Sequence, residues 1–159
     1  MTTFEQKNSK LVVRDAKIIF RNFSGRDTKY DNSGKKTFCI FIGDRETADM
    51  LRDYGWYVKP LKSRNDEEEH FCIQVTVKFH EDREFLNPVI EAYTRQQKTV
   101  LDDESVGILD FADIYNINIV LSPYYYKDRN GESKISAYLK KLAVAIDEDD
   151  FSDEYGYSD

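Results

Sequence analysis

The sequence predicts an all-β fold with one short helix, arranged as an antiparallel barrel of five to seven strands with projecting β-hairpins. Short apolar runs with a period of two are separated by turn residues, and strands do not alternate with helices as they would in a parallel sheet. Eleven Tyr and ten Phe add side chains that favour strands. One apolar run also changes face at Lys140–Lys141, which indicates the β-bulge that a small closed barrel needs.

The first third of the chain predicts a long β-hairpin. The runs Leu11–Phe23 and Thr37–Ile42 flank a polar connection that contains Asn32 and Gly34, residues that tolerate turn dihedrals. Strand alternation would place Ala16, Ile18 and Phe20 on one face and Lys17, Ile19, Arg21 and Phe23 on the other. Residues 1–9 are polar and are expected to be loose.

A short helix is expected after Ile42. Asp44 can cap its N-terminus, Ala48, Leu51 and Tyr54 form an apolar stripe, and Gly55 can end it in a left-handed conformation. A helix of about three turns is better suited to capping a sheet than to reading a DNA groove.

The remaining strands follow from alternation and turn signals. Phe71–Phe79 should turn its odd-numbered residues inward, Pro88–Thr94 should pair with Thr99–Leu101, and Ile114–Pro123 should bury Tyr115, Ile117, Ile119 and Leu121. The strand Ile114–Pro123 continues through Tyr124–Tyr126 to a turn at Asn130–Gly131, and the final strand, Lys134–Ile146, returns beside it.

The charge is divided unevenly along the chain. The net charge is −7, but residues 147–159 hold seven acidic side chains and no Lys or Arg, so residues 1–146 are neutral. We therefore expect a folded domain at 1–146 and a flexible, disordered acidic tail at 147–159.

No catalytic or metal-binding motif is present. The sequence has no phosphate-binding glycine loop, nucleophile elbow, HExxH or CxxC. Cys39 and Cys72 occur singly and are expected to be reduced. We expect no cofactor, no metal and no enzymatic activity. With no signal peptide or apolar span, the expected location is the cytoplasm, without membrane contact.

Basic and aromatic residues are interleaved in the first third. Nine Lys or Arg and three Asp lie between Lys7 and Lys36, and five aromatic rings are interleaved with them from Phe20 to Phe41. Cations beside flat rings on a two-stranded platform suit an unpaired nucleic-acid strand, although an ordinary soluble hairpin would show the same pattern. A small bulged barrel with projecting hairpins is typical of the oligonucleotide-binding (OB) fold.

Several segments in order resemble a known family. They are KIIFRNFSG at Lys17–Gly25, Lys29–Tyr30, the strand Gly34–Ile42, GWYVKPL at Gly55–Leu61, LDDESVGILDFADI at Leu101–Ile114 and SAYLKKLAVAI at Ser136–Ile146 before the acidic tail. Over roughly residues 10–150 the chain resembles the small single-stranded DNA-binding proteins of tailed bacteriophages and prophages, which have an OB fold. The resemblance implies coating of unpaired DNA without sequence specificity in phage replication or recombination. It also implies a tail that recruits phage or host replication and recombination proteins.

Candidate DNA-binding residues are cations for phosphates and rings for bases. The cations are Lys17, Arg21, Arg26, Lys29, Lys35, Lys36, Lys59, Arg95, Lys98 and Lys140, and the rings are Phe23, Tyr30, Trp56, Tyr57, Tyr93, Tyr124, Tyr125 and Tyr126. In the tail, Asp149, Asp150, Phe151, Asp153, Glu154 and Tyr155 are candidates for binding partner proteins or for occupying the basic groove when DNA is absent. A merely solubilising terminus is the alternative.

Two other function classes stay open at this stage. Acidic runs at Asp66–Glu69, Asp102–Glu104 and the tail would suit an interaction protein, a phage-encoded acidic decoy that inhibits a host DNA-binding enzyme. His70, His80 and nearby acids would be needed for a metal-dependent nuclease. The oligomeric state, monomer or dimer, is not predicted.

Overall fold

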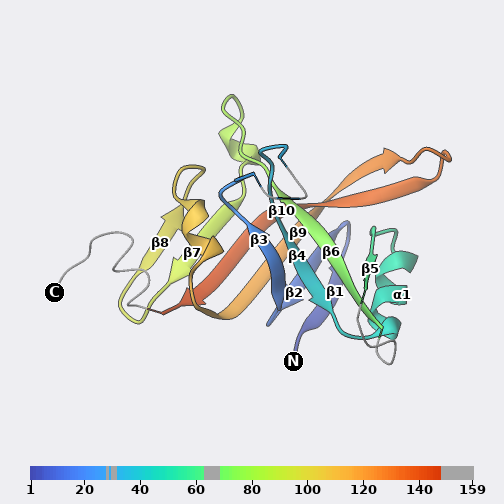
Figure 1. Cartoon of the computed structure of the whole chain (residues 1–159), viewed down its shortest axis with the longest axis horizontal. Helices are drawn as coiled ribbons and strands as arrows, with labels where there is room; N and C mark the ends of the chain where they lie inside the picture. The colour runs from blue at the N-terminus through green and yellow to red at the C-terminus, as the bar shows by residue number, and fades with distance from the viewer. Residues whose placement is uncertain (28, 30–31, 63–68, 148–159) are drawn as a thin grey trace.

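The computed structural model describes residues 1–27, 29, 32–62 and 69–147, and within them the protein is an all-β structure with one α-helix (Figure 1). The described residues form ten strands in one sheet: β1 (Thr3–Lys7), β2 (Lys10–Arg14), β3 (Ile18–Asn22), β4 (Lys36–Ile42), β5 (Lys59–Leu61), β6 (His70–Val77), β7 (Val89–Tyr93), β8 (Lys98–Leu101), β9 (Ile114–Lys127) and β10 (Ser133–Ile146). The helix is α1 (Arg45–Asp53), and two 3₁₀ turns are η1 (Glu84–Leu86) and η2 (Val106–Asp110). The predicted fold class is confirmed, with more strands than expected.

Two long strands, β9 and β10, form the centre of the sheet. Each has 14 residues, and they pair antiparallel up to the turn at Asn130–Gly131, whose tip projects beyond the body (Figure 1). The predicted bulge is confirmed, because the register shifts between Leu139 and Lys141. The first half of β10 pairs with β6 and the second half with β7, both in parallel, which the sequence did not predict.

The strands β3, β4 and β6 form the other wall of the core. Phe38 and Ile40 of β4 are fully buried, and Val75 of β6 meets them from the next strand. The sheet curls far enough that the Ala16 amide, just before β3, donates a hydrogen bond of 2.9 Å to the Ile117 carbonyl of β9. In β6 the expected alternation is confirmed for the inward Phe71, Ile73, Val75 and Val77 and the outward Gln74 and Thr76, whereas Cys72, which was expected to face out, is buried.

The first predicted strand is divided, and the expectation for residues 1–9 is wrong. Asp15 has φ +53°, which breaks the run into β2 and β3. Residues Thr3–Lys7 form β1, which pairs antiparallel with all of β2. The polar residues of β1 alternate with half-buried ones, and the strand covers an edge that β2 would otherwise leave open.

The helix α1 has the predicted ends. The Asp44 carboxylate accepts a 2.9 Å hydrogen bond from the Thr47 amide, and Gly55 follows at φ +101°. Ala48 and Leu51 are buried against the sheet. The ring of Trp56 is also buried, and its indole N–H donates to Gln6 of β1 at 2.8 Å.

The β7–β8 hairpin and η2 lie at the other end of the molecule from α1 and β5 (Figure 1). The predicted pairing of these two strands is confirmed. Tyr115 was expected to be buried but is exposed, because a second register shift between Ala145 and Ile146 changes the face at the start of β9. The tail residues after Asp147, including all six of its candidate residues, lie outside the described part of the chain.

Candidate nucleic-acid interface

The outer face of β4 and β6 carries polar side chains opposite the core residues. Because side chains alternate along a strand, burial of Phe38, Ile40, Ile73 and Val75 turns their neighbours outward. The outward residues are Thr37, Cys39, Cys72, Gln74 and Thr76. They form a floor that is hollowed in two adjoining places.

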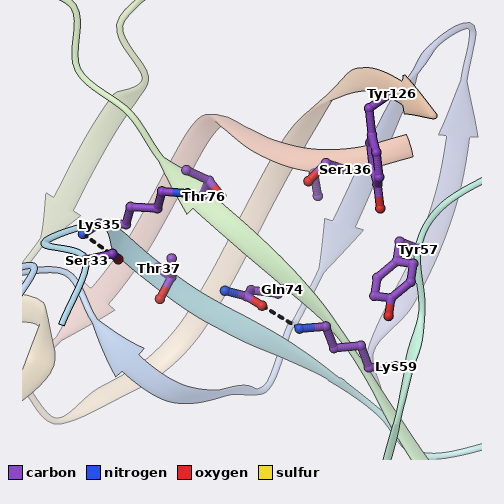
Figure 2. A pocket seen from close by; sticks show the side chains of 10 residues that line it. Ser33, Lys35, Thr37, Tyr57, Lys59, Gln74, Thr76, Tyr126 and Ser136 are labelled. Atoms are coloured by element: carbon purple, nitrogen blue, oxygen red, sulfur yellow. Dashed lines mark hydrogen bonds between the residues drawn. The ribbon is translucent and has the colours of Figure 1, made fainter. Parts of the chain in front are cut away.

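The first hollow, of about 420 Å³, lies between this floor and the β9–β10 hairpin (Figure 2). Lys35 lies at one side, and Tyr57 and Tyr126 lie at the other with Ser136 near them. The Lys59 ammonium donates a 2.7 Å hydrogen bond to Gln74 at the bottom and lies 5.8 Å from the centre of the Tyr57 ring. Such cation–ring contacts keep both groups in place beside a ligand.

The second hollow, of about 610 Å³, continues from the first over β3 and β5. Its lining adds Phe20, Arg21 and Arg26 from the β3 side and Pro60 and Leu61 from β5. Both hollows share Thr37, Lys59 and Gln74, so together they make one channel, called the groove from here on.

The groove is positive although the protein is an anion. Among the described residues, its lining includes Arg21, Arg26, Lys35 and Lys59 and contains no Asp or Glu. Arg26 pairs with Asp110, whose side chain is fully buried, at 3.0 Å. The other three cations form no ion pair with any residue in the described ranges, so their charge is available to an anionic ligand.

Asp110 of η2 fixes the β3 end of the groove. Its carboxylate accepts hydrogen bonds from the Phe23 amide at 2.6 Å, the Ser24 amide at 3.2 Å and the Ser24 hydroxyl at 2.7 Å, besides the Arg26 guanidinium. Arg21 reaches the same turn, because its guanidinium donates to the carbonyls of Leu109 and Ala112 at 3.2 and 2.7 Å. Both arginines are therefore pre-positioned.

Phe20 presents its ring at this end because the backbone is left-handed there. Its φ is +54°, and the β3–β4 register shifts between Ile19 and Asn22. The shift separates Phe20 from the face that it was expected to share with Ala16 and Ile18 and leaves 68% of the residue exposed. An exposed ring at a strained backbone position is typical of a residue held for function.

Two thiols lie in the floor. The hydrogen bond from the Cys39 thiol, aided by the Lys59 ammonium and opposed by burial, lowers the pKa of Cys72 to about 7. The same bond raises the pKa of Cys39 above its ordinary value. Both cysteines are free, as predicted.

A family model for the phage ssDNA-binding domain matches residues 1–158. The chain belongs to this family. No curated protein matches the sequence. The fold is similar to that of a single-stranded DNA-binding protein from bacteriophage Enc34, with a TM-score of 0.53 at 9% identity over 91% of this chain and 89% of that one.

Two other solved structures match over similar lengths. A C-terminally truncated form of the Enc34 protein gives a TM-score of 0.50 at 11% identity, covering 92% of this chain and 96% of that chain. The single-stranded DNA-binding protein gp2.5 of bacteriophage T7 gives 0.39 at 12% identity, covering 91% and 99%. The family assignment and the shared fold make this chain a phage-type single-stranded DNA-binding protein with an OB-like fold.

Six of the candidate DNA-binding residues of this family member lie together in the groove. They are Arg21, Arg26, Lys35, Tyr57, Lys59 and Tyr126. Phe20 was not among the candidates, because strand alternation placed it on the face opposite Lys17 and Arg21. The candidates also lacked four polar residues that only their outward parity in β4, β6 and β10 could have indicated, namely Thr37, Gln74, Thr76 and Ser136.

Two aromatic candidates must be corrected. Phe23 is fully buried, with its ring 5.0 Å from that of Phe38, so no base can stack on it in this structure. Trp56 is buried beneath β1 as described above. Both rings build the core, and the register shift and the unexpected β1 explain why the sequence misplaced them.

The other candidates lie outside the groove lining. Lys17 is exposed before β3, Lys29 is exposed in the β3–β4 connection, and Tyr30 lies outside the described residues. Lys36 is bonded to Asp103, and Lys98 lies 3.3 Å from Glu91 in the β7–β8 hairpin that also carries Tyr93 and Arg95. Lys140, Tyr124 and Tyr125 are exposed on β9 and β10.

Neither a metal site nor a membrane-spanning helix is present in the described residues. They contain no group of three or more His, Cys, Asp or Glu side chains that could hold a metal ion. They also contain no helix with the length and apolar character to cross a membrane.

Proposed function

We propose that this protein coats unpaired DNA during phage replication and recombination, in the host bacterial cytoplasm, by laying the strand in the groove. It acts by binding, without catalysis or a cofactor. The observation that carries the proposal is the lining of the groove, whose described residues include four cations and no carboxylate in a protein of net charge −7. Phosphates would meet Arg21, Lys35 and Lys59, and bases would stack on Phe20, Tyr57 and Tyr126.

The chemistry of the floor supports binding without sequence specificity. Thr37, Gln74, Thr76 and Ser136 offer hydroxyl and amide groups, and the Gln74 amide oxygen is already occupied by Lys59. Discrimination between bases requires fixed bidentate partners such as a free Gln or Arg fork. Stacking on rings accepts every base, because each base has a π-face.

The acidic decoy has less support from the described residues. Asp102 accepts hydrogen bonds from the amides of Glu104 and Ser105 in its own turn, and Asp103 is bonded to Lys36. These carboxylates therefore serve the fold. For residues 147–159 we keep the proposal of a tail that recruits partner proteins.

The test is fluorescence anisotropy with single-stranded and duplex oligonucleotides over a range of salt. Three unpaired groove cations predict a slope of log Kobs against log salt of about −2.1, an affinity loss of roughly 18-fold between about 50 and about 200 mM salt. In a Lys35→Gln/Lys59→Gln variant the slope should fall to about −0.7. The matched control is Arg83→Gln/Arg129→Gln, which removes the same charge from exposed positions outside the groove lining. An unchanged slope in the groove variant would refute the proposal.

A further inference from the structure

Outside the groove, the outer face of β2, β9 and β10 holds two lysines close to one another. Lys10 begins β2, and the pairing of Leu11 with Leu121 places it beside Ser122 of β9. Ser122 pairs in turn with Tyr138 of β10. Lys140 is the extra residue of the β10 bulge, where two consecutive residues, Lys140 and Lys141, both point outward.

Lys10 and Lys140 differ from the lysines next to them in their ion pairing. Lys141 lies 3.5 Å from Glu91, and Lys7 lies 3.9 Å from Glu5. Lys10 and Lys140 form no ion pair with a residue in the described part of the chain. The adjacent Lys10 lowers the pKa of Lys140, through the close approach of the two side chains and through the charge of its ammonium.

Two adjacent ammonium groups without a carboxylate repel one another, and an anion between them removes the repulsion. The side chains are exposed on the sheet surface, where a phosphate has free access. The Lys10–Lys140 pair therefore attracts a polyanionic ligand more strongly than an isolated surface lysine does.

A stacked pair of tyrosines lies beside the lysines. The rings of Tyr124 and Tyr138 are 5.3 Å apart at 22°, and Tyr124 is 54% exposed. The pair offers a flat aromatic face that is already ordered. Rings next to cations are the combination that single-stranded nucleic acid uses, with bases on the rings and phosphates on the charges.

The patch adjoins the groove at two positions of the sheet. Tyr138 pairs with Thr76, and Tyr124 pairs with Ser136. Thr76 and Ser136 both line the groove. A strand that leaves the groove past Tyr126 thus meets the Tyr124–Tyr138 pair next and the two lysines after it.

We propose that Lys10, Tyr124, Tyr138 and Lys140 form a second segment of the DNA site, the exit patch, which binds the single strand after it leaves the groove. The inference rests on the proposed function of the groove and extends it around the barrel onto β9, β10 and β2. Short oligonucleotides would occupy the groove alone, and longer ones would occupy both segments.

The test is a ladder of oligothymidylates from about 4 to about 24 nucleotides, which brackets the site sizes of OB folds. For the wild-type protein, the salt slope should steepen from about −2.1 on short oligonucleotides to about −3.5 on long ones, because two further phosphates are neutralised. In a Lys10→Gln/Lys140→Gln variant, the long oligonucleotides should keep the slope of about −2.1 while the affinity for short ones is unchanged.

The salt slope of the same Arg83→Gln/Arg129→Gln control should steepen with oligonucleotide length as that of the wild type does. Tyr124→Ala gives an independent readout and should weaken binding of long oligonucleotides at least about 5-fold without affecting short ones. An exit-patch variant whose slope still steepens with length would overturn the inference. Failure of the groove proposal would look different from failure of the exit-patch proposal. If the groove proposal fails, Lys35→Gln/Lys59→Gln leaves the affinity for short oligonucleotides unchanged.

Discussion

Replacement of Phe20 should change protein stability and DNA affinity in opposite directions. The residue lies at φ +54° with 68% of its surface exposed, so its ring contributes little to the core. A left-handed backbone costs an L-residue roughly 1–2 kcal/mol, a cost that glycine avoids. We expect Phe20→Gly to increase the free energy of unfolding by about 1 kcal/mol, after allowing for the greater flexibility of glycine in the unfolded chain.

The same substitution should weaken DNA binding. A base stacked on an aromatic side chain is worth about 1–3 kcal/mol, so loss of the ring predicts a dissociation constant about 5- to 160-fold larger. Phe20→Ala should show the same loss of affinity without the gain in stability, because alanine retains the strained backbone.

Urea unfolding and anisotropy titration of the same preparations measure both effects. Phe85→Ala is the matched control, since Phe85 is 83% exposed in η1 and lies outside the groove lining. That control should leave affinity unchanged. If Phe20→Gly and Phe20→Ala bind oligonucleotides as tightly as the wild type, the groove does not use this ring.

Four further predictions concern the core, the groove and the tail. Phe23→Ala should lower the free energy of unfolding by about 3–5 kcal/mol, measured in urea, because it removes a fully buried ring; a loss below about 1 kcal/mol would contradict the packing. Asp110→Ala should lower the free energy of unfolding by about 2–4 kcal/mol, because it leaves the Phe23 and Ser24 amides and Arg26 without their acceptor. Asp82→Ala, on the exposed surface, should change the free energy of unfolding little. N-ethylmaleimide should alkylate Cys72 slowly, because the residue is buried in the groove floor, and the rate should rise through a pH of about 7, where its thiolate forms. Bound oligothymidylate should slow the reaction further, and equal rates with and without DNA would place the strand elsewhere. Deletion of residues 148–159 should tighten DNA binding at low salt, as judged by anisotropy, and an unaltered dissociation constant would exclude competition by the tail.

The sequence predicted those parts of the fold that depend on interactions between residues close together along the chain. The alternation of β6, the Asp44 cap, the turn at Asn130–Gly131 and the bulge at Lys140 were all readable, because each depends on neighbours along the chain. The pairing of β10 with β6 and β7 was not readable, since parallel partners lie far apart in sequence and carry no turn signal between them.

The candidate site was predicted less well than the fold, for a specific physical reason. A register shift in β3 separates Phe20 from the face that it was expected to share with Ala16 and Ile18 and leaves it exposed, while Phe23, a predicted stacking ring, lies in the core. Positive φ values at Asp15 and Phe20 set this outcome, and no glycine marks either position. Trp56 was misplaced because β1, which covers it, has a polar composition typical of a loose terminus.

The overall charge of this protein does not determine its ligand, because salt limits the range over which each charge acts. At about 0.1 M salt the screening length is roughly 10 Å, so a phosphate in the groove responds mainly to the lining residues and little to distant carboxylates. The described lining has four cations and no acid, and Asp110, which holds the β3 end of the groove, is neutralised by Arg26. Acidic residues such as Asp102, Asp103 and Glu91 are instead used in turns and ion pairs of the body. A local positive channel on a negative molecule can therefore bind a polyanion, provided that its lining excludes carboxylates, as the described lining residues do.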